Sequence, residues 1–392
     1  MSRFTRRSAI AGAGALVGSL FLRKPLLGAG APADPVSVAL CRSYGPELVS
    51  TLDRMFDQLG GLGRIVNGKT VAMKVNLTGL ADERVGGLPC GLTHWTHPSV
   101  IGAVVHLMGR AGARRIRILE SPWKTTEPID EFLLQAGWEP LDLLNAAPHV
   151  EFENTNYLGT GKRYVRLTTP RGGHIFRAFD LNHSYQDCDV FVSVAKLKEH
   201  RTAGVTLSMK NCFGITPCTI YGDNAGVDEP GLVPQGGRGI LHSGVRQPSK
   251  SAPSENNPAS PRDPGYRVPA IVADLVAARP IDLAIIDGIQ TQTRGETPGV
   301  RGAIVVAPGV LIAGTNCVST DAVGTAVMGF DPMADRGRAP FERCDSTLRL
   351  AEELGVGSRD LSRIEVLGTP IAQVRFDFRK ATAARNAAPK KG

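Results

Sequence analysis

The chain has 392 residues, of which 42% are hydrophobic and 6% aromatic, so it is long enough for one large α/β domain or two smaller ones. Its formal net charge is +8, but ten basic residues and no acidic residue lie in residues 1–33 and in the tail from Arg379. The rest of the chain is therefore nearly neutral, which argues against a nucleic-acid-binding protein.

Residues 1–33 have the pattern of a twin-arginine signal peptide. Arg6 and Arg7 precede an apolar run of modest hydrophobicity, and small residues follow at Ala31-Pro32-Ala33. A simple secretory signal or an uncleaved anchor has the same parts. We expect the twin-arginine export machinery as a partner and a periplasmic or extracellular location. No later stretch approaches the ~20 apolar residues of a spanning helix, so we expect no stable transmembrane segment after processing.

Apolar runs alternate with segments of helical spacing over the first half of the remaining chain. They predict, in chain order, a strand at residues 36–40, a helix at 46–59, a strand at 70–76, a helix at 99–109, a strand at 113–120 and a helix at about 129–137. Strands that alternate with helices form parallel sheets with right-handed crossovers. We therefore expect an α/β fold with a mostly parallel sheet and helices on both faces.

The second half begins with weaker patterns. Two β segments at residues 164–168 and 174–179 predict an edge hairpin, whereas residues 216–267 lack periodicity and predict a long irregular insertion. The clearer segments are a strand at 190–195, a helix at 268–278, a strand at 281–286, a hairpin of 303–306 with 310–313, helices ending at 328 and spanning 341–354, and a strand at 364–367. We expect a single α/β domain over residues 34–380 and a disordered basic tail over 381–392.

Cationic and amide side chains follow two of the predicted strands. Lys74 and Asn76 end the strand at 70–76, and Lys196 ends the strand at 190–195, with Lys210 and Asn211 shortly after it. A lysine beside a strand is by default a solvated charge. Because parallel strands end at one edge of a sheet, however, these residues are expected to converge there and to bind a small anionic molecule, a carboxylate or a phosphate. Lys198 receives less weight.

Two histidines are candidate acid/base residues. His200 follows a buried strand and is flanked by cations, which lower the pKa of its imidazole and favour a neutral base. His97 precedes Pro98 at the start of a helix, where it is either a second base or only a helix cap. Two bases on opposite sides of a carbon atom are what a racemase or epimerase needs. His106, His149, His174 and His183 are expected to have structural roles.

Metal binding has a weaker signal. Asp287 ends a strand before a glycine, and His242 lies in the irregular insertion; together with Glu296 they suggest a divalent-metal site, although no short ligand motif is present. The seven cysteines include no C-x-x-C pair, which excludes the usual signatures of c-type haem and ferredoxin-type clusters. We expect most of these cysteines to be buried and reduced.

The stretches Lys196-Leu-Lys-Glu-His200 and Gly204-Val-Thr-Leu-Ser-Met-Lys210-Asn211-Cys-Phe-Gly214 resemble the family named domain of unknown function 362. Thr96-His97-Pro98, Asp287-Gly288 and the segment from Asp321 to Gly329 occur in the order found in that family. The resemblance covers nearly the whole chain after the signal. Some relatives carry ferredoxin-type clusters, for which the cysteine spacing here gives no place.

A weaker similarity links the chain to the N-terminal part of nickel-pincer lactate racemase. It implies His200 as an acid/base, Lys210 as the lysine that holds a nickel-containing cofactor, and His242 as a metal ligand. Ser208-Met209 replaces the glycine pair expected before the lysine, so the similarity suggests a reaction class only.

These observations predict an exported enzyme that transfers a proton next to a carboxylate, as racemases, epimerases and lyases do. The main alternative is a non-catalytic ligand-binding or redox-partner protein that uses the same pocket. A surface interaction protein without a deep pocket is a third class.

Overall fold

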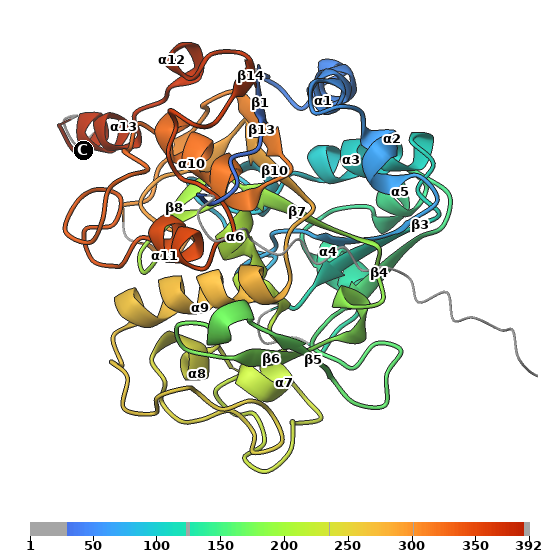
Figure 1. Cartoon of the computed structure of the whole chain (residues 1–392). Helices are drawn as coiled ribbons and strands as arrows, with labels where there is room; N and C mark the ends of the chain where they lie inside the picture. The colour runs from blue at the N-terminus through green and yellow to red at the C-terminus, as the bar shows by residue number, and fades with distance from the viewer. Residues whose placement is uncertain (1–29, 123–125, 235, 301, 388–392) are drawn as a thin grey trace, which may run out of the picture. The chain divides into compact units, whose positions relative to one another are not determined.

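The computed structural model describes residues 30–122, 126–234, 236–300 and 302–387 (Figure 1). Residues 1–29 of the predicted export signal and residues 388–392 of the predicted tail lie outside the described residues. Residues from Ala31 onward form one compact unit. Its fold is built around a central sheet.

The central sheet has eight strands. In spatial order they are β14 (Val366–Gly368), β1 (Val36–Leu40), β13 (Val310–Gly314), β10 (Leu283–Gly288), β7 (Val190–Lys196), β2 (Thr70–Lys74), β3 (Arg115–Glu120) and β4 (Val150–Asn154). β13 runs antiparallel to both of its neighbours, and the other pairs are parallel. The predicted mostly parallel α/β sheet is confirmed.

Side chains of each strand alternate between two apolar layers. In β7, Val190, Val192 and Val194 pack in one layer, and Phe191 and Ala195 pack in the other. Such strands read as near-continuous apolar runs because both faces are covered. The alternation decides to which side of the sheet each polar residue at a strand end points.

Helices cover both faces of the sheet (Figure 1). The layer that contains Val192 includes α1 (Glu47–Gln58), α2 (Leu62–Val66), α3 (Pro98–Arg110), α4 (Ile129–Gln135) and α5 (Pro140–Leu144). The layer that contains Phe191 includes α6 (Ser208–Asn211), α9 (Pro264–Ala278), α10 (Cys317–Val327) and α11 (Thr347–Glu353). We refer to these as the α3 layer and the α9 layer.

Smaller elements complete the described part of the chain. Three two-stranded ladders pair β5 (Val165–Thr168) with β6 (Ala178–Leu181), β8 (Lys198–His200) with β9 (Gly204–Thr206), and β11 (Thr291–Gln292) with β12 (Val305–Val306). The remaining helices are α7 (Cys218–Tyr221), α8 (Gly239–His242), α12 (Ile371–Val374) and α13 (Phe378–Ala387), with 3-10 turns at Cys90–Leu92, Pro170–Gly172, His183–Tyr185 and Cys212–Ile215.

Several boundaries differ from the sequence-based expectation. β12 pairs with β11, whereas β13 enters the central sheet, because all five residues of β13 are buried. α9 begins at Pro264, with Asp263 as its N-cap, so Pro269 lies inside the helix. α13 covers residues 381–387, for which we expected disorder; Phe378 at its start is fully buried, and the alanine-rich sequence that follows favours a helix.

Two further features concern the length and apolarity of the helices and the state of the cysteines. Among the described residues, no helix is both long enough and apolar enough to cross a membrane. All seven cysteines are free thiols, and only Cys188 is partly exposed.

Candidate functional site

A cavity of about 390 Å³ opens at the carboxyl edge of the parallel strands. Six of the nine residues predicted for the site line it: Lys74, Asn76, His200, Lys210, Asn211 and His242. A larger surface groove of about 1340 Å³ lies beside β5 and β6, and none of the nine predicted residues lines it. The smaller cavity is therefore the candidate site.

The position of α6 is set by a buried carboxylate. Asp321 in α10 accepts hydrogen bonds from Ser208 N at 2.9 Å, Ser208 Oγ at 2.5 Å and Met209 N at 2.9 Å. Burial raises the pKa of Asp321 to about 7, although these hydrogen bonds act in the opposite direction and lower it. Asp321 thus fixes the start of α6, and with it the direction of Lys210 and Asn211.

One wall of the cavity is a network of fully paired polar groups. Lys74 Nζ lies 2.6 Å from Glu120 Oε1 and donates to Val75 O and to Asn211 Oδ1. Asn76 Nδ2 donates to the same Asn211 oxygen at 3.1 Å. Burial lowers the pKa of Lys74, and the Glu120 carboxylate acts against that shift. These contacts hold Lys74 in place as a fixed charge.

Lys198 is a second lysine that hydrogen bonds hold in the cavity wall. Its side chain is fully buried, and its Nζ donates to Asn76 Oδ1 at 3.0 Å, His94 O at 2.6 Å and Glu296 O at 3.0 Å. All three acceptors are neutral, so burial lowers the pKa of Lys198 well below its usual value, with the Glu296 charge opposing. We gave this lysine less weight from the sequence, yet it lines the cavity.

Lys210 differs from the other lysines of the cavity. Its Nζ lies 4.3 Å from the centre of the Phe213 ring, and no acceptor within the described residues takes a hydrogen bond from it. Burial lowers the pKa of Lys210 to about 7, Glu296 opposes the shift, and Arg238 and Lys74 add to it. At neutral pH, a substantial fraction of this amine is uncharged.

The ring of His200 is held by the β8–β9 hairpin. Thr202 N donates to His200 Nδ1 at 3.1 Å, so the proton of the neutral ring lies on Nε2. Burial lowers the pKa of His200 to about 3, and nearby Lys210 contributes, although Glu296 acts in the opposite direction. His200 is therefore a neutral hydrogen-bond donor at its Nε2.

His242 has the opposite tautomer. Its Nδ1 lies 2.8 Å from Arg238 O, a carbonyl that only accepts, so Nδ1 carries the proton and Nε2 carries a lone pair. Burial and the Lys210 charge lower the pKa of His242 to about 4. Its ring also packs edge-on against Phe213, at 4.9 Å between centroids, which places it beside the ring that Lys210 faces.

Two further features favour a ligand in the cavity. Thr206 Oγ1 is buried in the cavity wall without a hydrogen-bond partner among the described residues. Arg238 Nε and Nη2 bind backbone carbonyls of Thr216 and Ser121, whereas no bond to Nη1 is recorded within the described residues. Unpaired polar groups in a cavity wall are costly unless a solvent or ligand atom pairs with them.

Lys196, Asp287 and His97 form a separate cluster and do not line the cavity. Lys196 Nζ lies 2.8 Å from Asp287 Oδ2, and both side chains are fully buried. His97 N donates to the same carboxylate, while His97 Nδ1 caps α3 by accepting from Ser99 N at 3.1 Å. Tyr44 stacks on the His97 ring at 3.6 Å. Of the two roles left open for His97, this arrangement is that of a helix cap.

Strand alternation explains the separation. Lys74 points to the same side of β2 as Ala72, into the α9 layer, whereas Lys196 points to the same side of β7 as Val194, into the α3 layer. Both lysines end at one edge of the sheet, as predicted, but on opposite faces of it.

The residues present do not fit a metal held by His242 and Asp287 together. Asp287 is engaged by Lys196 and His97 in the α3 layer. In the part of the chain that the structure describes, no group of three or more His, Cys, Asp and Glu side chains is placed to hold a metal ion. We therefore assign no chemical step to a metal.

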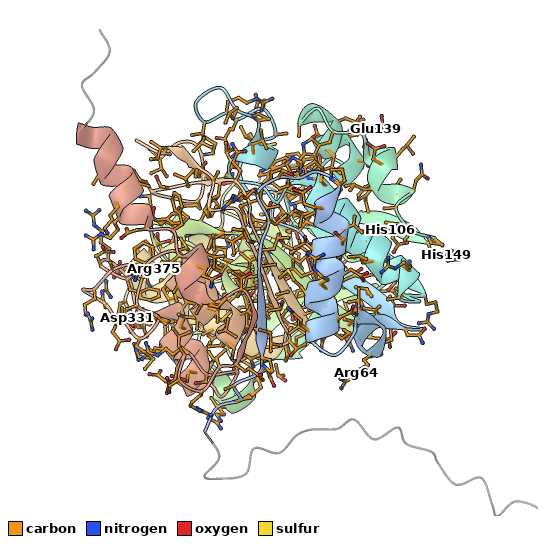
Figure 2. All side chains as sticks on the ribbon, turned by 90° about the horizontal axis from the view of Figure 1, so that it is seen from above. Arg64, His106, Glu139, His149, Asp331 and Arg375 are labelled. Carbon is orange, nitrogen blue, oxygen red and sulfur yellow. The ribbon has the colours of Figure 1, made fainter. Side chains whose placement is uncertain are left out.

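Other cavity residues were missed or undervalued from the sequence. Glu120 ends β3 at the same edge of the sheet as Lys74. The reasoning that parallel strands place their last residues at one edge predicts Glu120 as well as Lys74. Arg238 lies in an irregular segment without any local signal, and Glu296 was considered only as a partner in a metal site. Figure 2 shows His106 and His149 at the outside of the molecule, where both are exposed, and neither of them lines the cavity.

The sequence of the chain is similar to a known protein family and to a protein from a cyanobacterium. A model of the family described as "Domain of unknown function (DUF362)" matches residues 71–326. A thylakoid-associated protein of Synechocystis is 29% identical over 185 residues, which cover 46% of this chain and 51% of that protein. The chain thus spans about half the length of this curated relative.

Two solved structures resemble the chain more distantly. A protein from Thermotoga maritima has a TM-score of 0.36 at 15% identity and covers 79% of this chain and 58% of that one. The lactate racemase apoprotein of Thermoanaerobacterium thermosaccharolyticum has a TM-score of 0.34 at 10% identity and covers 70% and 54%. Similarity at this level carries no inference about function.

Proposed function

Because this chain belongs to the domain of unknown function 362 family, whose shared segment includes nearly all of the cavity, we propose that it is an enzyme acting on a small anionic substrate. The reaction is proton transfer next to a carboxylate, of the racemase, epimerase or lyase type. The observation that carries this proposal is the pairing of two neutral imidazoles of opposite tautomer, His200 and His242, around one partly buried amine, Lys210.

Charge favours an anion in the cavity. Its lining includes four cations, Lys74, Lys198, Lys210 and Arg238, and three carboxylates, Glu83, Glu120 and Glu296. With both histidines neutral, one positive charge is unbalanced when all three lysines are protonated, and a single carboxylate or phosphate group would neutralise it. Arg238 Nη1 is the donor best placed to bind that group, because Lys74 and Lys198 are already paired.

The two histidines divide the proton chemistry. His242 Nε2 carries a lone pair and is the general base for a proton next to the carboxylate. His200 Nε2 carries a proton and donates a hydrogen bond to the substrate oxygen on which negative charge develops. A ligand oxygen can also accept from Thr206 Oγ1, which has no partner among the described residues. His97, expected from the sequence as the second base, has no part in this scheme.

Deuterium exchange tests the reaction. Small 2-hydroxy, 2-amino and 2-oxo acids are incubated with the protein in D₂O. Loss of the C–H proton next to the carboxylate, or next to the carbonyl group in a 2-oxo acid, is followed by NMR. We expect His242→Gln to slow exchange by about 10²- to 10⁴-fold, the usual contribution of a general base. His106→Gln is the matched control, because His106 is exposed on α3 (Figure 2) and does not line the cavity.

Binding separates an enzyme from a binder. A ligand that raises the melting temperature of the wild type but undergoes no exchange would indicate the non-catalytic ligand-binding alternative. In that case His200→Gln should leave the affinity within a few-fold, whereas in an enzyme the same change should abolish turnover. If no carboxylate or phosphate binds at all, the site assignment is wrong.

We also propose export by the twin-arginine route to the periplasm or the exterior, on the basis of the sequence of residues 1–33. Changing Arg6 and Arg7 to lysine together should leave the precursor in the cytoplasm, as measured by cell fractionation. Unchanged export of this variant would argue for a different route.

A further inference from the structure

Lys210 has the features of a nucleophile. We infer that Lys210 Nζ forms an imine with the carbonyl carbon of a 2-oxo acid bound in the cavity, where the amine faces a space of about 390 Å³ and no described acceptor engages it. This inference rests on the proposed function and deepens it. It names the substrate class, gives the lysine a covalent role, and places the transferred proton on the carbon beyond the carbonyl of the 2-oxo acid.

The other three buried lysines of the sheet edge serve as an internal comparison. Lys74, Lys196 and Lys198 each donate two or three hydrogen bonds at 2.6–3.2 Å, and two of them also face a carboxylate. An ammonium held in this way has no lone pair to offer. Lys210 Nζ is the exception among these four.

The surroundings of Lys210 favour the neutral amine. Burial and the Arg238 and Lys74 charges lower the pKa of Lys210 to about 7, and Glu296 is the charge that opposes them. His200 and His242 are neutral in this range because burial lowers their pKa values to about 3 and 4. A lysine desolvated beside other cations is the arrangement that activates an amine for attack on a carbonyl.

The neighbours supply the proton steps. The lone pair of Lys210 Nζ forms a bond to the carbonyl carbon, and the C=O π bond breaks toward its oxygen, which accepts a hydrogen bond from His200 Nε2. His242 Nε2, beside the Phe213 ring that Lys210 faces, takes the proton that the amine loses. The two amine protons and the carbonyl oxygen leave as one water when the C=N bond forms, so no oxidant or reductant is needed.

A 2-oxo acid matches the remaining groups. Its carboxylate is complementary to Arg238 Nη1, which has no hydrogen-bond partner among the described residues, and its carbonyl carbon lies next to that carboxylate, within reach of the same site. The imine acidifies the C–H bonds of the carbon beyond the carbonyl, C3 of the acid, and His242 can then remove a proton from C3. The cavity volume lies at the lower end of the range for small-molecule sites, which favours a small substrate.

Reductive trapping tests the inference. The full chain is incubated with pyruvate, glyoxylate or 2-oxobutyrate, treated with sodium borohydride, and mapped by peptide mass spectrometry. We expect a stoichiometric adduct on Lys210 with at least one of these acids, and none with lactate, which has no carbonyl. Lys250, whose side chain is exposed, is the internal reference for non-specific modification.

Two variants distinguish imine formation at Lys210 from non-specific modification. Lys210→Met should abolish trapping while retaining the melting temperature of the wild type within a few degrees, and His106→Gln should change neither. Adducts spread over exposed lysines, or none on Lys210 with any 2-oxo acid, would overturn the inference. If carboxylates still bind and His242-dependent exchange persists without trapping, the imine is wrong and the proposed function stands; if no anion binds, both fail.

Discussion

Replacing Lys196 with methionine separates a structural role from a role in the cavity. The Lys196 side chain is fully buried, and the substitution removes its contacts with Asp287 Oδ2 at 2.8 Å, Gly91 O at 3.0 Å and Tyr44 OH at 3.1 Å. Methionine has nearly the same length as the aliphatic part of lysine, so little packing is lost. The main effect is a buried Asp287 carboxylate without its cation.

The loss of unfolding free energy in Lys196→Met depends on the hydrogen bonds that Asp287 retains. Breaking a buried ion pair by removing one partner costs about 3–5 kcal/mol. Asp287 retains hydrogen bonds from His97 N, Tyr44 OH and Ile289 N, so we expect the lower end, about 3 kcal/mol. With an unfolding entropy of about 2.1 cal/mol/K per residue over roughly 350 residues, this corresponds to a fall in melting temperature of about 4 °C.

Calorimetry of Lys196→Met, Asp287→Asn and the double variant measures this effect. We expect the double variant to be less destabilised than the sum of the two, with a coupling of about 2 kcal/mol. The affinity for a bound carboxylate should stay within a few-fold in all three, because the pair faces the α3 layer. A Lys196→Met protein that melts within about 1 °C of the wild type but no longer binds the anion would refute this reasoning.

Three further predictions concern the cavity itself. Asp321→Ala should destabilise the protein by about 2–4 kcal/mol, since it leaves the N–H groups that begin α6 without an acceptor, and should weaken anion binding in a thermal-shift titration. Gly214→Ala places a Cβ 3.0 Å from Lys74 Nζ; we expect a loss of about 1–3 kcal/mol on urea unfolding, and an unchanged midpoint would contradict the close approach. Burial lowers the pKa of Lys210 to about 7, and only the uncharged amine reacts, so its acylation rate should rise as the pH increases through 7 and level off above it. An acylation rate of Lys210, read by mass spectrometry, that stays low at pH 8 and rises only at much higher pH would contradict the neutral amine.

The sequence predicted the sheet and its edge well because local patterns carry that information. Runs such as Val190–Lys196 are apolar on both faces, and a parallel order places their carboxyl ends together. Lys74, Asn76, Lys210 and Asn211 were found for this reason. The partner of each strand was harder to infer, since β13 looked like half of a hairpin and only its burial on both faces shows that it belongs to the sheet.

The division of the edge into two faces could not be read from the sequence alone. Alternation gives the side within one strand, but comparing Lys74 with Lys196 requires the relative register of β2 and β7. The tautomers of His200 and His242 depend on Thr202 N and Arg238 O, which are contacts made by loops. Arg238 comes from a segment without periodicity, so nothing local marked it, and Glu296 was considered only as a partner in a metal site.

The place of β1 in the sheet has a consequence for biosynthesis. Val36 is paired with Gly314 on one side and with Val366 on the other, so both neighbours of β1 lie far along the chain from it and are made much later. At usual translation rates, a ribosome needs on the order of tens of seconds to reach them. During that time β1 has neither of the two strands with which it pairs in the sheet. A nascent chain that ends before β13 lacks both of them.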